Sequence, residues 1–264
     1  MIPTNIREGL TNARDAVGSA IERAAARTNV DFSYLFNQAK VESGLNPNAK
    51  ARTSSATGLF QFIDQTWLGT VKKHGAAHGL DWAASAIRCG PDGRYSVADP
   101  GMRQAILGLR HDPDAASSMA AEFARDNQAT LEDRLDRPVE SVDLYLAHFL
   151  GAAGASQFLR AHDADPDAPA ATLMPAAARA NRWVFYNRDG SPCSFAEIRN
   201  RFAAKIGGSA TPPASTPRAR DLNTNEFLPI RPTTLAAADP RAVPAAPSPQ
   251  YARLAYLMLA DLGA

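Results

Sequence analysis

The sequence predicts a mainly α-helical domain with a small β element, followed by a tail rich in proline and alanine. Apolar residues recur at helical spacing through most of the segment from Arg7 to Ile206, and glycine and proline separate the periodic stretches. Few runs in this segment are β-branched, which argues against a large sheet. After Ile206 the composition changes, because nine of the chain's 19 prolines lie in residues 207–250.

These observations predict a chain of four parts. Residues 1–29 form an amphipathic helix and residues 30–206 form the helical domain. Residues 207–250 form a Pro/Ala-rich linker, which we expect to be disordered because it buries too little apolar surface to offset its chain entropy. Residues 251–264 carry an apolar stripe and predict a short C-terminal helix, which should be ordered only when docked on the domain or on a partner protein.

Composition excludes several classes of partner. The chain has 264 residues, of which 45% are hydrophobic, and its 28 Lys and Arg residues nearly balance 27 Asp and Glu residues. A formal net charge of +1 argues against nucleic acid or an anionic membrane as the main partner. The longest charge-free apolar stretch, Leu144 to Leu159, contains His148 and Gln157 and is too short to span a bilayer.

The N-terminus and the cysteines say little about the compartment. Charged residues interrupt the first apolar stripe, so the sequence shows no recognisable secretory signal peptide. Cys89 and Cys193 could form one disulfide bridge or remain two free thiols.

The first helix of the domain has clear start and stop signals. Asp31 is placed to cap it, and Gly44 followed by Asn46-Pro47 ends it. The helical wheel predicts that the buried stripe of this helix contains the following residues: Phe32, Phe36, Ala39 and Ser43, with Leu35 at its edge.

Four further helices and one strand are predicted. Asp64 and Ser141 each precede a periodic stretch and could cap a helix. Residues 114–126 and 195–206 also show helical spacing. The best strand candidate is the segment 58–63, Gly-Leu-Phe-Gln-Phe-Ile.

Glu42 is the candidate with the most chemical interest. It falls beside Leu35 on the helical wheel, at the border between core and surface, in the last turn of its helix. Partial burial and the negative end of a helix dipole both disfavour the charged form of a carboxyl group. A carboxylic acid at the rim of a cleft is the proton donor that glycosidic cleavage requires. Periodicity alone also permits a glutamate that simply faces solvent.

The residues around Glu42 carry a resemblance to a known family. Glu42-Ser43, Leu45-Asn46-Pro47, Ala49, Ser55 and Gly58-Leu59-Phe60-Gln61 occur in order. This pattern resembles the catalytic domain of soluble lytic transglycosylases, which has a goose-type-lysozyme-like fold. The close match covers Gln38 to Trp67, and a looser helical resemblance continues to about Leu159.

The resemblance implies a reaction and a site. Glu42 would be the single acid/base catalyst that cleaves the β-1,4 bond between N-acetylmuramic acid (MurNAc) and N-acetylglucosamine (GlcNAc) in peptidoglycan, giving a 1,6-anhydro product. Ser43 and Gln61 would line the site and hydrogen-bond to the glycan. Gly58 would permit either a close approach to a sugar or a tight turn. No second acid precedes Asp64 in the motif block, which agrees with a mechanism that does not need the two carboxylates of ordinary glycosidases.

A third element of the family departs from its usual form. The family carries Ala-Tyr-Asn followed by glycine on a later helix. Alignment on Ala147 and Gly151 puts His148 at the tyrosine position, and Tyr145, one turn earlier, could supply the phenol instead. Tyr145 and His148 are therefore both site candidates, and simple packing roles are the alternative for each.

No cofactor is expected. His74 and His78 have metal-ligand spacing, but Gly75 interrupts the helix between them and no third ligand is near in the sequence, so no metal site is predicted.

Two other functions stay open at this stage. One is a hydrolytic muramidase or chitinase-like glycosidase on the same fold, and the other is a non-catalytic wall-binding or assembly module. In either case the expected partner is peptidoglycan, at the periplasm or cell wall. The tail could dock on a protein of a flagellum, a secretion apparatus or a phage particle.

Overall fold

The computed structural model of the chain describes residues 4–52 and 54–207, with side chains from Asp15 onward. The predicted linker and the predicted C-terminal helix therefore lie outside the described residues. Within them, the prediction of a mainly α-helical fold with a small β element is confirmed.

Helices make up most of this part of the chain, together with one hairpin. The elements are, in chain order, α1 (Thr4–Thr28), α2 (Phe32–Ser43), α3 (Asp64–His74), the 3-10 turn η1 (Gly75–His78), α4 (Asp81–Ala86), β1 (Ile87–Cys89), β2 (Tyr95–Val97), α5 (Pro100–Gly108), the 3-10 turn η2 (Leu109–His111), α6 (Pro113–Leu135), α7 (Ser141–Ala164), α8 (Ala170–Leu173), α9 (Pro175–Ala180), α10 (Arg182–Phe185) and α11 (Phe195–Ile206).

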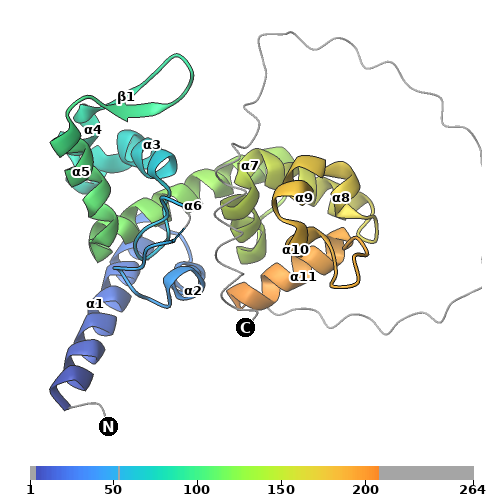
Figure 1. The fold of residues 1–264 in the computed structure, drawn as a ribbon, viewed down its shortest axis with the longest axis horizontal. Coiled ribbons are helices and arrows are strands. Elements are labelled where there is room, and N and C mark those ends of the chain that lie inside the picture. Colours follow the sequence, from blue (N-terminus) through green and yellow to red (C-terminus); the bar gives the residue numbers. More distant parts are fainter. Residues whose placement is uncertain (1–3, 53, 208–264) are drawn as a thin grey trace, which may run out of the picture.

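The central element is α6, which contacts α1, α2, α3 and α7 (Figure 1). One lobe contains α3 to α5 with the β-hairpin, and the other contains α7 to α11. The helix α2 lies between them and packs against α1, α6 and α11. The second half of α1 buries Val17, Ile21 and Ala24 in the same hydrophobic core as the two lobes. Removal of these side chains from water stabilises the packing of α1 against α6.

The predicted strand at residues 58–63 is wrong. This segment is a series of turns with isolated bridges, in which Thr57 pairs with Phe62 on one side and Lys50 on the other. Gly58 and Gln61 both have positive φ angles, 83° and 49°, which a regular strand does not accommodate. The regular strands are β1 and β2, which pair antiparallel with Ile87 opposite Val97.

Helix starts follow the predicted capping residues only in part. The Asp31 cap is confirmed, because its carboxylate accepts the N–H of Tyr34 at 2.7 Å. Asp64 is not a cap: α3 starts after Ile63, and the Asp64 carboxylate instead contacts two arginine side chains. Ser141 is not a cap either, since α7 starts after Glu140.

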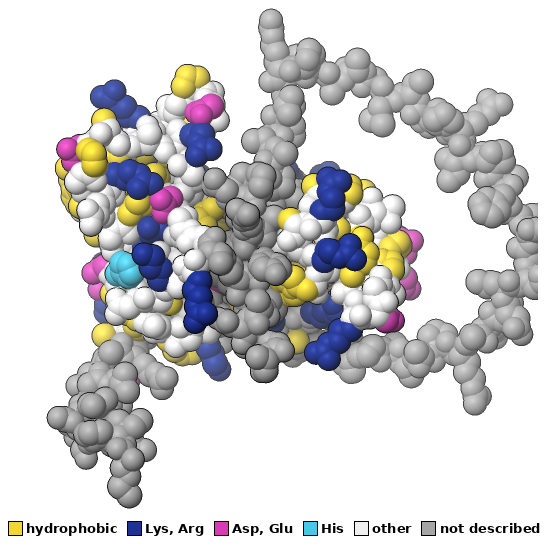
Figure 2. Space-filling model, in the orientation of Figure 1, with side chains coloured by type: hydrophobic (Ala, Val, Ile, Leu, Met, Phe, Trp, Pro, Cys, Tyr) yellow, Lys and Arg dark blue, Asp and Glu magenta, His cyan; other side chains and the backbone are white. Residues whose placement is uncertain are grey.

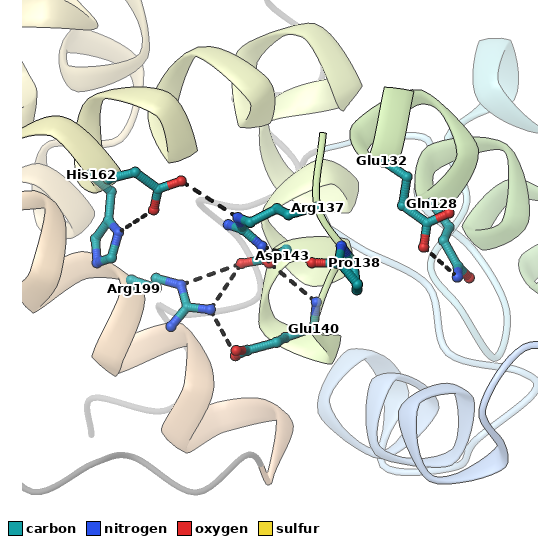
Figure 3. A network of polar contacts seen from close by, with 9 residues as sticks. Gln128, Glu132, Arg137, Pro138, Glu140, Asp143, His162 and Arg199 are labelled. Carbon is teal, nitrogen blue, oxygen red and sulfur yellow. Dashed lines mark hydrogen bonds and ion pairs between the residues drawn. The ribbon is translucent and has the colours of Figure 1, made fainter. Parts of the chain in front are cut away.

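A buried carboxylate fixes the start of α7 to α11. The side chain of Asp143 is fully buried and contacts Arg137 at 2.9 Å and Arg199 at 3.0 Å, and it accepts the N–H of Glu140 at 3.1 Å (Figure 3). A buried charge is tolerated when it is paired and hydrogen-bonded in this way. Arg199 comes from α11, so this network holds α11 against α7.

Two features of the structure bear on nucleic acid and membranes, the partners that the composition argues against. On the face drawn in Figure 2, Lys and Arg side chains are spread over both lobes instead of forming one patch. None of the helices within residues 4–52 and 54–207 combines the length and apolar character that a membrane crossing requires.

The two cysteines are free thiols, with Cys89 exposed and Cys193 buried, so the alternative of a bridge between them is not realised.

We expect Asp143→Ala to lower the free energy of unfolding by about 3 kcal/mol, because Arg137 and Arg199 lose the carboxylate that compensates them. Urea denaturation monitored by circular dichroism measures this change. Asp163→Ala is the matched control, because Asp163 contacts Arg137 from an exposed position at 3.5 Å and should contribute less than about 1 kcal/mol. Equal effects of the two substitutions would contradict the role assigned to Asp143.

Candidate active site

Glu42 is more buried than the sequence predicts. Its side chain is 0% exposed, although the helical wheel placed it at the border between core and surface. The predicted stripe of α2 is wrong in part. Leu35 and Ala39 are buried as predicted, but Phe32 is exposed, and the buried face also contains Tyr34, Gln38 and Glu42. The helical wheel gave the wrong face because it was built on apolar residues, whereas three side chains with polar ends, Tyr34, Gln38 and Glu42, lie on the buried face of this helix.

The end of α2 is tied to the loop that follows it. The hydroxyl of Ser43 donates to the carbonyl oxygen of Leu59 at 2.8 Å and accepts the N–H of Asn46 at 3.1 Å. Both functions of the hydroxyl are thus used within the protein. Ser43 holds the last turn of α2, and with it Glu42, against the segment around Leu59.

Gln61 supports the same loop. Its amide nitrogen donates to the carbonyl oxygens of Gly58 at 2.9 Å and Ala49 at 3.2 Å. An amide NH2 group has two hydrogens, and both are therefore used in the loop. Only the amide oxygen of Gln61 is left to accept a hydrogen bond from a bound molecule.

Gly58 is required by the protein backbone. Its φ is 83°, and a Cβ atom at this position would lie 1.9 Å from the carbonyl oxygen of Arg110. The close approach is therefore to η2, which contains Arg110, and the tight-turn alternative describes this glycine better than an approach to a sugar.

Arg110 is a loop-supporting residue that no signal in the sequence singles out. Its guanidinium donates to the carbonyl oxygens of Ser55 and Phe62, both at 2.8 Å, and contacts Asp64 at 3.0 Å. Burial lowers the pKa of this guanidinium, and the Asp64 carboxylate opposes that shift. The side chain thus ties the two ends of the turn segment together from 46 or more residues away in the chain.

Of the two third-element candidates, His148 makes the direct contact. Its Nε2 lies 3.3 Å from Oε1 of Glu42. Tyr145 stacks on the imidazole with ring centroids 6.0 Å apart and an interplanar angle of 8°, and Phe123 meets its edge. The helix α7 breaks its regular path at Gly151, where φ is 73° and ψ is 157°, one turn after His148.

Two tyrosines enclose the carboxylate. The pKa of Tyr145 lies well above its ordinary value, first because the phenol is buried and then because the Glu42 carboxylate is near. The pKa of Tyr34 is raised for the same two reasons, in the same order. The Tyr145 hydroxyl lies within reach of the carboxylate, but the geometry is short of a formed hydrogen bond.

The groups around Glu42 share an unusual property: several of their buried polar atoms have no hydrogen-bond partner within residues 4–52 and 54–207. This is true of both carboxylate oxygens of Glu42, both ring nitrogens of His148, Oε1 of Gln38 and Nζ of Lys205. Buried polar atoms are normally satisfied, so a cluster of unsatisfied ones marks a place where a ligand or water binds.

Lys205 is the second residue that sequence reasoning missed. It lies in the last turn of α11, and its only sequence signal is membership of an amphipathic helix. Burial lowers the pKa of its ammonium group to about 8, and the Glu42 carboxylate opposes that shift.

His74 and His78 lie elsewhere, and acidic residues that are distant in the sequence meet them. Nε2 of His78 is 2.7 Å from Glu122, and Nε2 of His74 is 2.8 Å from Asp126. Both carboxylates come from α6, so they are distant from the two histidines in the sequence. Among the residues whose structure is described, no group of three or more such side chains is arranged to hold a metal ion.

The loop between α2 and α3, residues 44–63, is called the motif loop below. A separate hollow of about 530 Å³ lies on the side of this loop that faces α5 and η2. Nine residues line it: Lys50, Ser55, Thr57, Asp64, Gln104, Leu107, Gly108, Arg110 and His111. None of the site residues predicted from the sequence belongs to this lining, so the hollow and the surroundings of Glu42 are different places.

Comparison with known families identifies the part of the chain that contains Glu42. Residues 19–84 match the family model described as the transglycosylase SLT domain. The matched segment runs from the second half of α1 into α4 and contains Glu42 and the motif loop, whereas His148 and Lys205 lie beyond it. The predicted resemblance is confirmed: the chain carries an SLT-type domain in a mainly helical, lysozyme-like architecture.

The domain also gives a coarse function. A transglycosylase-type activity on peptidoglycan follows from the SLT domain, and with it a role at the periplasm or cell wall.

We expect Gly58→Ala to destabilise the protein by about 3 kcal/mol or more, because its Cβ would collide with the Arg110 carbonyl at an already unfavourable positive φ. Gly79→Ala is the matched control: φ there is 73°, but nothing lies within 4 Å of the new Cβ, so only about 1 kcal/mol should be lost. Chemical denaturation of both variants measures the difference, and similar losses would refute the assignment of Gly58 to backbone packing.

Proposed function

We propose that the protein is a peptidoglycan lytic transglycosylase in which Glu42 is the single general acid and base. The observation that carries this proposal is the Glu42 carboxyl group, which is fully buried at the end of α2 and accepts no hydrogen bond from the described residues. Of the described groups that interact with it, namely Tyr34, Tyr145, His148 and Lys205, none is a second carboxylate. A mechanism with one acid fits this arrangement better than one with two.

In the first step, the protonated carboxyl group of Glu42 would donate its proton to the glycosidic oxygen between MurNAc and GlcNAc. The bond from C1 of MurNAc to this oxygen breaks, and GlcNAc leaves with a free 4-hydroxyl group. Positive charge develops at C1, where the 2-acetamido oxygen of the same sugar can stabilise it. Protonation of the leaving oxygen is the usual contribution of a general acid to such cleavage.

In the second step, the Glu42 carboxylate would remove the proton from the C6 hydroxyl of the same MurNAc residue. The C6 oxygen then bonds to C1 and closes the 1,6-anhydro ring. Glu42 regains its proton, and water is neither consumed nor released. One carboxyl group therefore completes the cycle.

Burial of Glu42 supports this non-hydrolytic outcome. A site that excludes water leaves the C6 hydroxyl as the nucleophile at hand, since a competing water molecule has little room to enter. Because the Glu42 side chain is fully enclosed, a glycan reaches it only if neighbouring groups move apart on binding.

His148 would position the catalytic carboxyl group. Its Nε2 is 3.3 Å from Oε1 of Glu42, and its ring is fixed between Tyr145 and Phe123. An imidazole N–H directed at the carboxylate would select one rotamer of Glu42 and stabilise the charge that it carries between the two steps. In this role, His148 replaces the tyrosine of the family's third element.

We expect Glu42→Gln to reduce cleavage of purified peptidoglycan by at least about 10²-fold, because an amide has the shape of a carboxylic acid but cannot donate or return the proton. Glu22→Gln, at an exposed position of α1, should retain full activity. Mass spectrometry of the muropeptides released by the wild-type protein should find products lighter by one water than hydrolysed ones. Near-normal turnover by the Glu42→Gln variant, or reducing-end products from the wild-type protein, would rule out this mechanism.

We expect His148→Ala to lower kcat by about 10- to 100-fold with little change in KM, because a contact with the catalytic carboxyl group is removed while the glycan contacts stay. Tyr145→Phe keeps the stacked ring and should lower kcat by less than about tenfold. Steady-state kinetics on soluble glycan strands separate the two parameters. A larger effect of Tyr145→Phe would assign the positioning role to the phenol instead.

A further inference from the structure

We propose that Lys205 is a substrate-binding residue of the Glu42 site, and that its ammonium group receives a carboxylate carried by the muramoyl branch of the glycan. This inference rests on the proposed function and adds to it the group that distinguishes peptidoglycan from an uncharged polymer of GlcNAc. Lys205 lies outside the segment that matches the SLT domain.

Contacts on both sides of Lys205 locate it beside Glu42. Phe202, one turn earlier on α11, packs on Tyr145 and Phe149 of α7 with ring centroids 5.6 and 5.0 Å away. Gly207, two residues later, approaches α2 so closely that a Cβ on it would lie 3.0 Å from Nδ2 of Asn37. The end of α11 therefore lies between α2 and α7, the two helices that carry Glu42 and His148.

The ammonium group has no partner in the described part of the chain. Nζ of Lys205 is buried and makes no hydrogen bond, and the Glu42 carboxylate acts on its charge without forming an ion pair within 4.0 Å. Other partly buried cations of this protein are paired: Arg110 with Asp64, and both Arg137 and Arg199 with Asp143. A buried cation without a partner is unfavourable, so the position is better explained by a ligand than by folding.

The chemistry of the ligand follows from the charge. An ammonium group is a strong donor to a carboxylate, and the contact is charge-assisted. The sugar rings and acetamido groups of the glycan are uncharged, so its carboxylates lie on the lactyl ether of MurNAc and on the peptide attached there. Polymers of GlcNAc alone carry neither group. A carboxylate that meets Lys205 would fix which sugar of the repeat stands beside Glu42, and so which bond is cleaved.

The decisive experiment measures binding in the Glu42→Gln background, in which the glycan is not consumed. Lys205→Met removes the charge and keeps the length of the side chain, and Lys40→Met, on the exposed side of α2, is the matched control. Four probes are compared by calorimetry: peptide-bearing glycan strands, peptide-free strands with exposed lactyl carboxylates, their methyl esters, and chitin oligosaccharides.

We expect Lys205→Met to weaken binding of carboxylate-bearing strands by about tenfold or more and to leave binding of the esters and of chitin oligosaccharides unchanged. Loss with peptide-free strands assigns the lactyl carboxylate, and loss only with peptide-bearing strands assigns the peptide. Affinity of the Glu42→Gln parent for the strands should fall as the pH rises and Lys205 loses its proton, and this fall should be absent in Lys205→Met. Without the Glu42 carboxylate, which raises the pKa of Lys205, the fall should begin below the value of about 8 that applies to the wild-type protein. Equal losses on all four probes, or none, would overturn the inference.

Thermal stability distinguishes a binding role from a structural one. The lowered pKa means that protonated Lys205 destabilises the folded state below about pH 8, and that this cost disappears as the pH approaches the ordinary value of 10.5. Lys205→Met should therefore have a Tm at about pH 7 equal to or above that of its parent. A clearly lower Tm would show that Lys205 supports the fold.

The binding inference and the proposed reaction can fail separately. If the wild-type protein releases no anhydro product while Lys205-dependent binding is intact, the proposed reaction alone is refuted.

Discussion

The rest of the described structure accommodates one constraint, which is that the Glu42 carboxyl group is buried without a hydrogen bond from any described residue. A carboxyl group in this state is unfavourable for folding, and it persists only if the elements around it are held firmly by other interactions. The helix α2 is fixed at its start by Asp31 and at its end by Ser43, while α6 supports it from the core. The Asp143 network keeps α11 against α7, which closes the remaining side. Stability is thus supplied away from the site, and the site itself contains the unsatisfied groups.

The motif that identifies the family is mostly a support. Ser43 uses its hydroxyl on Leu59, Gln61 uses its amide hydrogens on Gly58 and Ala49, and Gly58 makes room for the backbone at Arg110. Each of these residue types is required at its place by a contact within the protein. The consequence is that these contacts hold the loop against α2, and that the oxygen atoms left to meet a substrate are those of Glu42 and the amide oxygen of Gln61.

The sequence predicted elements whose signals are local. Asp31 as a cap, the end of α2 at Gly44, and the helix at residues 195–206 all follow from short-range chemistry, and each is confirmed. The buried face of α2 was assigned wrongly, because its inward side chains include Gln38 and Glu42 and a wheel built on apolar residues points away from them. The strand at 58–63 failed because the positive φ of Gln61 cannot be read from residue type. Of the long-range partners, His148 was a candidate only because the resemblance to the family pointed to its third element. No signal in the sequence indicated that Lys205 comes to Glu42 from α11.

The residues of the proposed site fall into two groups. Those near Glu42 in the sequence and those that come from distant helices also differ in their proposed roles. The segment that matches the SLT domain contains Glu42, the acid of the proposed mechanism, and the residues that support it. The residues that face the acid from α7 and α11 lie outside that segment, and two of them, His148 and Lys205, bear charges or ionisable groups without hydrogen-bond partners in the described part of the chain. In the proposed mechanism, cleavage requires the proton of Glu42, whereas the choice of glycan would depend on groups that meet the branches of the sugar. On this proposal, substitution of Lys205 in α11 should change which glycan is bound before it changes how the bond is broken, because Lys205 makes no hydrogen bond to the described groups that hold Glu42.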